Sequence, residues 1–152
     1  MSQIISVVPN VCEGRDEAFV EKVQEKLEAV PGLVVLDVSM DQVRNRTIFS
    51  FTGRKEAVFE GGFLLYEAAL GQIDMRKHEG EYPRIGAVDV FPFVALRDAP
   101  VATAVDCSVQ FAEEVARSQT RMTPRPPSFT LPERKRILYA LVTPEMLAAA
   151  LS

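Results

Sequence analysis

Features that would assign a function by themselves are scarce in this 152-residue chain. Its 17 basic and 21 acidic residues give a formal net charge of −4, whereas nucleic-acid binding requires a clustered basic face. No apolar stretch reaches the ~20 residues of a membrane span, and the N-terminus lacks the basic region of a signal peptide. We therefore expect a cytoplasmic protein that binds neither nucleic acid nor a membrane.

Metal-binding and nucleophilic motifs are also missing. Cys12 and Cys107 form no CxxC pair and have no neighbouring base, which predicts inert free thiols in a reducing compartment. The sequence contains no zinc-ligand spacing, HExxH motif, glycine-rich phosphate loop or nucleophile elbow. We expect no metal in this protein.

What is present is typical of one globular domain over residues 1–152. Hydrophobic residues make up 47% of the chain and charged residues 25%, with no internal repeat. Apolar periodicity and the positions of proline and glycine predict the element order βαββαβ. The expected strands are 3–8, 33–40, 47–53 and 85–96, and the expected helices are 15–29, 54–73 and 100–117.

This order predicts an α+β fold, a ferredoxin-like βαββαβ sandwich with helices on one face of a mostly antiparallel sheet. The polar link 41–46 predicts a hairpin, and the apolar run at 33–36 predicts a strand buried on both faces. Pro92 predicts an edge or a bulge. Gly61-Gly62, inside a helix, predicts a contact too close for a side chain. The residues of the third helix expected to face inward are Val101, Val105, Phe111 and Val115.

The C-terminal part predicts an added α-β-α extension. It consists of the third helix, a strand over 137–143 and a short helix over 144–151. A proline-rich loop at 119–132 joins the third helix to that strand.

The stretch DMRKHEGEYPRIGAVDVFPF, residues 74–93, is dense in titratable groups and holds His78, the single histidine. It is longer than the usual connection of about 2–6 residues between a helix and a strand. Gly80, Pro83 and Gly86 restrict its backbone path. Composition alone leaves two readings open, a solvated loop and a functional site.

Two shorter stretches are weaker candidates. Glu13 and Arg15 lie near the start of the first helix, where backbone N–H groups bind anions, although an ordinary helix cap has the same appearance. Arg44 and Arg46 lie at the hairpin, where they could bind carboxylates or simply provide solubility.

Taken together, VPNVCEGR, LDV, NRTIFSFTG and DMRKHEGEYPRIGAVDVFPF resemble the N-terminal subdomain of glutamate formiminotransferase over roughly residues 3–118. The resemblance implies a βαββαβ-type sandwich that transfers a formimino group from formiminoglutamate to N5 of tetrahydrofolate. Tetrahydrofolate would be a co-substrate, and the ligand a folate or a glutamate-like carboxylate. The implied binding residues are Asn10, Glu13, Arg15, Arg44, Asn45, Arg46, Glu81, Arg84, Gly86 and Asp89.

Tyr82 departs from the family pattern at the catalytic position. The family's catalytic histidine occupies the variable position of GE-x-PR, which is Tyr82 here. The reaction needs a group that exchanges protons near neutral pH, and the usual pKa of tyrosine, about 10, is too high. His78, with an ordinary pKa of about 6.5, could substitute only if the loop brings its ring to the reacting carbon.

Three functions follow from this departure. The first is a catalytically impaired homologue that still binds a folate or a carboxylate. The second is an active transferase that uses His78, with Tyr82 as acid or orienting group and a second chain completing the site. The third is an interaction or regulatory protein without a small-molecule ligand.

The resemblance also predicts assembly and the place of the site. Family members continue into a second subdomain, and folate lies in the groove between the two. We expect the corresponding surface here to be covered in a homodimer or higher oligomer. We expect residues 74–91 to line the main concave site, with His78, Tyr82 and Arg84 facing it and Asp89 nearby.

Overall fold

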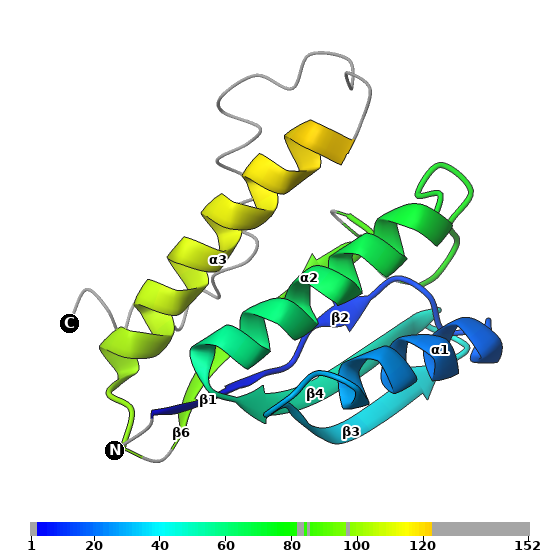
Figure 1. The fold of residues 1–152 in the computed structure, drawn as a ribbon. Coiled ribbons are helices and arrows are strands. Elements are labelled where there is room, and N and C mark those ends of the chain that lie inside the picture. The colour runs from blue at the N-terminus through cyan, green and yellow to red at the C-terminus, as the bar shows by residue number, and fades with distance from the viewer. Residues whose placement is uncertain (1–2, 82–83, 85, 97, 123–152) are drawn as a thin grey trace.

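The computed structural model describes residues 3–81, 84, 86–96 and 98–122 (Figure 1). The strand expected at 137–143, the helix expected at 144–151 and most of the loop 119–132 lie outside these residues. The described elements are β1 (Ile4–Val7), β2 (Asn10–Val11), α1 (Glu17–Glu28), β3 (Val34–Asp41), β4 (Arg46–Gly53), α2 (Lys55–Gln72), β5 (Val88–Val90), β6 (Phe93–Leu96) and α3 (Val101–Met122).

The strands form one antiparallel sheet built around β4. On one side β4 pairs with β3, and on the other it pairs with β1 and β2. β6 pairs with β1, and β5 pairs with β2. β1 and β2 thus act as one strand that is interrupted in the middle, and β5 and β6 act as a second. Pro9 and Pro92 lie at the two interruptions, because neither has an N–H group to donate to a sheet. Pro92, expected at an edge or a bulge, lies between β5 and β6, which are both at edges of the described sheet. The expected hairpin is confirmed, and in it Asp41 of β3 pairs with Arg46 of β4.

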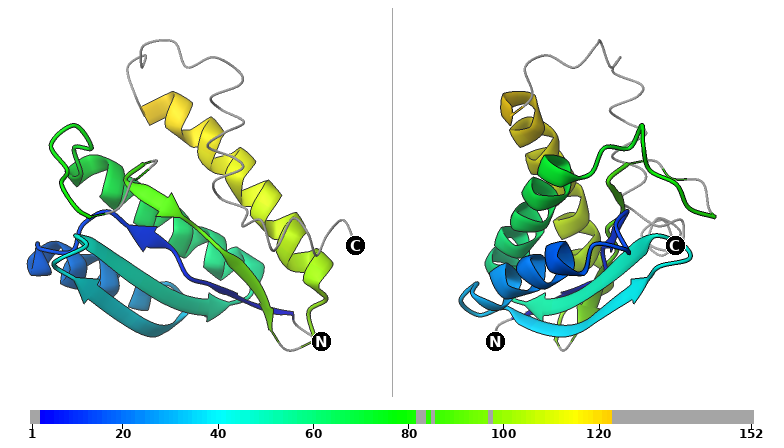
Figure 2. Two further views of the ribbon diagram at one scale, coloured as in Figure 1. Left: turned by 180° about the vertical axis from the view of Figure 1, so that it is seen from behind. Right: turned by 90° about the vertical axis from the view of Figure 1, so that its right-hand side faces the viewer.

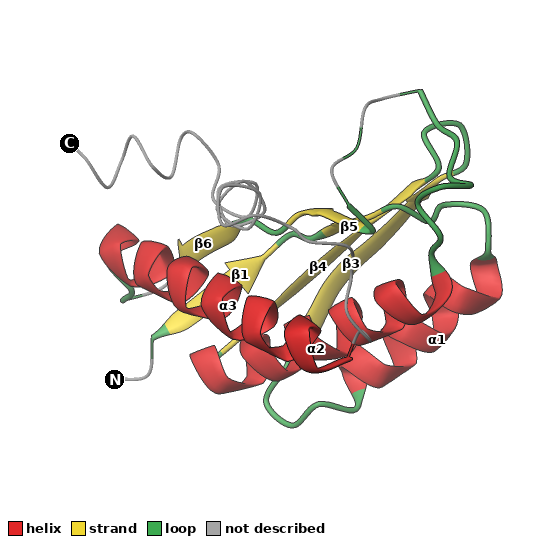
Figure 3. Ribbon diagram, turned by 90° about the horizontal axis from the view of Figure 1, so that it is seen from above, coloured by secondary structure: helices red, strands yellow, loops and turns green. Residues whose placement is uncertain are grey.

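All three described helices lie on one face of the sheet (Figure 3). α2 packs between α1 and α3, and α3 also contacts β6 (Figure 2). Along β4 buried and half-buried side chains alternate, which places Phe49 and Phe51 under the helices. The α+β class, with helices on one face of an antiparallel sheet, is confirmed. None of the helices in the described part combines the length and apolarity of a membrane span.

The glycine pair in α2 packs where a side chain would not fit, as expected. A Cβ atom on Gly61 would lie 2.8 Å from Cδ2 of Leu33. A Cβ atom on Gly62 would lie 2.5 Å from Cζ of Phe111, a fully buried ring. The lower helix propensity of the two glycines therefore accompanies close packing of α2 against its neighbours.

Two sequence predictions of burial are wrong. β3 is not buried on both faces, since Val34 and Leu36 are each 56% exposed. The described helices cover only the face of the sheet that holds Phe51, and Val34, which pairs with Thr52, lies on the other face. Within the described sheet β3 is also an edge strand, since it pairs with β4 alone. Val101, expected to face inward, is 55% exposed because it begins α3 beyond the core, whereas Phe111 and Val115 are buried.

Candidate functional site

Three loops meet at one end of the sheet (Figure 3). They are the β2–α1 loop at 12–16, the β3–β4 turn at 42–45 and the α2–β5 loop at 73–87. Hydrogen bonds join them, because Gly14 N donates to Asn45 Oδ1 at 2.9 Å and Asn45 Nδ2 donates to Glu79 O at 3.0 Å. Arg84 also donates to the carbonyl oxygen of Arg44. Segments far apart in the sequence thus form one loop cluster.

The start of α1 is already occupied by carboxylates of the chain. Asp16 is the N-cap and accepts from Phe19 N at 3.0 Å. Oε1 of Glu13 accepts from the backbone N–H groups of Arg15 and Asp16 at 2.8 and 2.9 Å. Arg15 in turn donates from Nε to Gln42 O at 3.0 Å. In this arrangement Glu13 takes up N–H groups that could have bound an external anion.

Gly14 lets this loop pack directly on the hairpin. A Cβ atom here would collide with backbone atoms of Asp41 and Arg46, lying 2.8 Å from Arg46 O. Beside it, Thr47 Oγ1 donates to Glu13 O at 2.5 Å. Only a residue without a side chain fits between the loop and β4.

The two hairpin arginines each pair with an aspartate of the chain. Arg44 is exposed, and its Nη1 lies 2.6 Å from Asp41 Oδ2; hydrogen bonds from the backbone and side chain of Arg44 lower the pKa of Asp41. Arg46 is largely buried, and its Nη2 donates to Asp89 Oδ2 on β5 at 3.0 Å. Nη1 of Arg46 also lies 3.5 Å from Asn10 Oδ1. The structure therefore brings Asn10, Arg46 and Asp89 together and directs Arg44 to its own partner.

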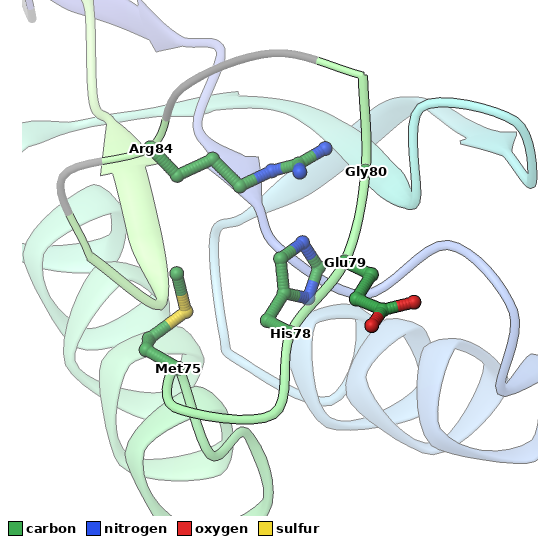
Figure 4. A pocket seen from close by; sticks show the side chains of 5 residues that line it. All are labelled: Met75, His78, Glu79, Gly80 and Arg84. Atoms are coloured by element: carbon green, nitrogen blue, oxygen red, sulfur yellow. The ribbon is translucent and has the colours of Figure 1, made fainter.

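A cavity of about 390 Å³ opens inside the α2–β5 loop, lined by Met75, His78, Glu79, Gly80 and Arg84. Figure 4 shows the His78 ring and the Arg84 guanidinium both directed into the loop, while the Glu79 carboxylate points outward. Met75 and Glu79 were missing from the sequence-based list. Only the position of these two residues inside the charged stretch could have suggested them.

Several of the predicted site residues lie outside this lining. Glu81 is exposed, and Gly86 accepts a hydrogen bond from Sγ of Cys12 at 3.2 Å. Tyr82 lies outside the described residues. The assignment of catalytic and binding roles to the site residues stays a prediction.

His78 is half-buried, and its surroundings disfavour the protonated ring. Burial lowers the pKa of His78, and the charge of Arg84 lowers it further. Arg15 and Arg46 act in the same direction, whereas Glu13 opposes them. Nε2 of His78 is buried and has no hydrogen-bond partner among the described residues, and the same holds for Nε of Arg84 and of Arg46. Two of these three residues, His78 and Arg84, also line the cavity.

The two cysteines are buried free thiols, as expected. Burial raises the pKa of Cys12, and Asp89 raises it further, while Arg84 and Arg46 oppose this. Burial likewise raises the pKa of Cys107. Both shifts disfavour the thiolate, which is the reactive form of cysteine.

Residues 4–124 match a family model described as "Formiminotransferase domain, N-terminal subdomain". The matched region contains the whole described sheet and all three loops of the cluster. The match covers most of the chain. The chain belongs to the formiminotransferase family, as a member related to its N-terminal subdomain.

Curated relatives agree with this membership. The chain is 39% identical over 116 residues to the formimidoyltransferase-cyclodeaminase of Rattus norvegicus, covering 76% of this chain and 21% of the relative. It is 38% identical over 117 residues to the glutamate formimidoyltransferase of Streptococcus pyogenes serotype M1, covering 77% and 39%. The chain thus spans well under half the length of either relative. Among solved structures, MupZ from Pseudomonas fluorescens covers 87% of this chain and 92% of its own, at 10% identity and a TM-score of 0.40, too weak a likeness to bear on the fold.

Proposed function

We propose that this protein is a formiminotransferase-type domain that binds a reduced folate or a glutamate-like carboxylate at the loop cluster, and that its transfer chemistry is impaired at Tyr82. The observation that carries the proposal is the cavity lined by His78 and Arg84, because each of these side chains has a buried nitrogen atom without a hydrogen-bond partner among the described residues. Both residues stand in the stretch that resembles the family most closely. Buried polar atoms are nearly always hydrogen-bonded in folded proteins, so these two favour a ligand with oxygen acceptors.

We also propose the ferredoxin-like arrangement for the sheet. Support comes from the strand pairs, which place β3, β4, β1 and β6 side by side in that order, all antiparallel. In such a sheet the β2–α1 loop, the β3–β4 turn and the α2–β5 loop gather at one end. The cluster of three loops is consistent with that placement.

The proposed impairment follows from the chemistry of the transfer. A weakly basic folate nitrogen attacks the amidine-like carbon of formiminoglutamate, a tetrahedral intermediate forms, and glutamate leaves as the amine. Each stage moves a proton, and a positioned acid–base typically contributes about 10²–10⁴ in rate. By resemblance, the histidine that does this in the family stands where this chain has Tyr82. A phenol with a pKa of about 10 is rarely in the basic form at pH 7.

Equilibrium titration with tetrahydrofolate tests the binding half of the proposal. We expect saturable binding by the wild-type chain and weaker binding by Arg84→Gln, which removes the cationic donor that lines the cavity. Lys77→Gln is the matched control, because this exposed cation of the same loop is not part of the lining. If the wild-type chain does not bind reduced folate or formiminoglutamate, the proposed function is wrong.

A rate assay tests the impairment. Tyr82→His should raise formimino transfer by roughly one to four orders of magnitude. Tyr82→Phe is the control, since it also removes the phenol but adds no base, and it should bring no gain. The assay is run with and without a separately prepared C-terminal subdomain of the S. pyogenes relative. If Tyr82→His gains nothing in either condition while folate binds, then the tyrosine is not the cause of the impairment.

A further inference from the structure

Asn45 lies where the three loops meet and is itself only 7% exposed. Its φ of 50° is in the left-handed region, which asparagine tolerates better than most residues. The side chain accepts from Gly14 N at 2.9 Å and donates to Glu79 O at 3.0 Å. Its Nδ2 also lies 3.4 Å from Nδ1 of His78. One amide thus contacts both other loops and the single histidine.

The orientation of this amide follows from its first two partners. The backbone N–H of Gly14 can only donate, so it faces the amide oxygen of Asn45. The carbonyl of Glu79 can only accept, so it faces the amide nitrogen. The group that faces Nδ1 of His78 is therefore an N–H donor. An N–H donor at this place favours an accepting Nδ1, and therefore a neutral ring with its proton on Nε2.

We propose that Asn45 is a positioning residue that fixes His78 in the neutral Nε2–H tautomer, so that His78 presents a hydrogen-bond donor rather than a base to the cavity. The functional meaning of this inference rests on the proposed function. Nε2 of His78 is buried, has no partner among the described residues and belongs to a side chain that lines the cavity beside Arg84. Its N–H would bind a carbonyl or carboxylate oxygen of the ligand.

This role explains why His78 does not replace the base that is missing at position 82. A general base needs a lone pair directed at the proton it removes. The only lone pair of neutral His78 is on Nδ1, where it faces Asn45. A catalytic use of His78 would require breaking that contact.

The charges around the ring agree with a neutral donor. Arg15 approaches from the β2–α1 loop, Arg46 from β4 and Arg84 from the same loop as His78, and the carboxylate of Glu13 is the one that opposes them. Three cations against one anion disfavour an added proton. The amide N–H of Asn45 would also be repelled by a second N–H on Nδ1.

Because the chain has one histidine, its ring nitrogens can be assigned without ambiguity in long-range ¹H–¹⁵N spectra of the ¹⁵N-labelled protein. The wild type should show the Nε2–H form above the pKa of His78. Free imidazole also favours this tautomer, so the variants decide. Asn45→Asp places a carboxylate oxygen against Nδ1, which should exchange the tautomer to Nδ1–H and raise the pKa of His78. Asn45→Ala should give a mixture of both tautomers.

Asn10→Asp is the matched control. Asn10 is the other asparagine of the chain and lies on β2, 3.5 Å from Nη1 of Arg46, so the variant adds the same charge near the loop cluster without facing Nδ1. It should keep the Nε2–H form. If the tautomer of His78 stays unchanged in both Asn45 variants, the inference is overturned. If it changes in them and in Asn10→Asp alike, charge alone is responsible and the inference is again wrong.

No folate or formimino donor enters this experiment. A failure of the tautomer test therefore leaves the binding titration intact, and a failure of folate binding leaves the tautomer result intact. Circular dichroism of each variant shows whether it is folded. Should Asn45→Asp fail to fold, Asn45→Ala and the control still distinguish the two outcomes.

Discussion

Replacing Gly62 by alanine sets two effects of opposite sign against each other in α2. Alanine favours a helix over glycine by about 1 kcal/mol, which would stabilise the protein. The added Cβ atom, however, would lie 2.5 Å from Cζ of Phe111 and 3.0 Å from Cζ of Phe91. Both rings are fully buried and contact each other with 4.7 Å between their centroids, so neither can easily move away. Overpacking of a core typically costs about 1–3 kcal/mol, so we expect a net loss of roughly 1 kcal/mol.

Gly71→Ala is the control in the same helix. A Cβ atom on Gly71 would meet nothing within 4 Å, so only the helix propensity acts, and this exposed position should gain about 0.5–1 kcal/mol. Urea unfolding followed by circular dichroism measures both variants. A shift of about 1 kcal/mol corresponds to roughly 2–4 °C in Tm for a chain of this size. If Gly62→Ala is as stable as Gly71→Ala, the tight packing of α2 against Phe111 is not a real constraint.

Three other predictions concern the site and the open face of the sheet. Asp89→Asn should reduce the free energy of unfolding, measured by urea titration, by roughly 1.5–3 kcal/mol, because the largely buried Arg46 loses its charged partner at 3.0 Å. Asp74→Asn is the control, because it breaks an exposed ion pair and should change the free energy of unfolding little. The pKa of His78 is lowered in the folded state. As the pH falls, His78 is therefore protonated in the unfolded chain at a higher pH than in the folded protein. The stability of the wild type relative to His78→Gln should therefore fall as the pH drops below 6.5 and level off below the folded pKa, and a flat difference would contradict the shift. Val94 and Leu96 are exposed on the face of the sheet away from the helices, and we expect this face to be covered in a homo-oligomer. Leu96→Glu should weaken the oligomer, and light scattering that shows a wild-type monomer at high micromolar concentration would refute the prediction.

The elements of the fold could be predicted where the sequence pattern is local. The alternation of TIFSFTG determines β4, and Pro92 breaks the last strand because proline has no N–H group to donate. The environment of a strand is not local. The apolar run LVVL is typical of a fully buried strand. In the structure, however, β3 pairs only with β4 in the described sheet, and the side chain of Val34 is exposed. Whether a strand lies at an edge depends on which partner the rest of the chain supplies.

The loop cluster shows the same division. The stretch 74–84 stood out by its composition, and it does form the cavity, with His78 and Arg84 in the lining. The sequence could not show which of these polar groups already have hydrogen-bond or ion-pair partners within the chain. Glu13 occupies the N–H groups at the start of α1, and Arg46 is paired with Asp89. Both residues looked available for a ligand because their partners are identified only by the fold.

The contact between His78 and Asn45 is the feature of the site that the sequence predicts least, because the two residues are far apart in the chain. His78 and Asn45 are 33 residues apart, and neither is unusual in its local sequence. The contact exists because Asn45 adopts a left-handed conformation at a turn and bonds to Gly14 and Glu79, which bring two other loops to it. A histidine four residues from Tyr82, where we propose that catalysis is impaired, would ordinarily be taken as the replacement base. The orientation that we propose for the Asn45 amide argues against this use of His78, because it leaves the proton on Nε2 and directs the lone pair of Nδ1 at Asn45.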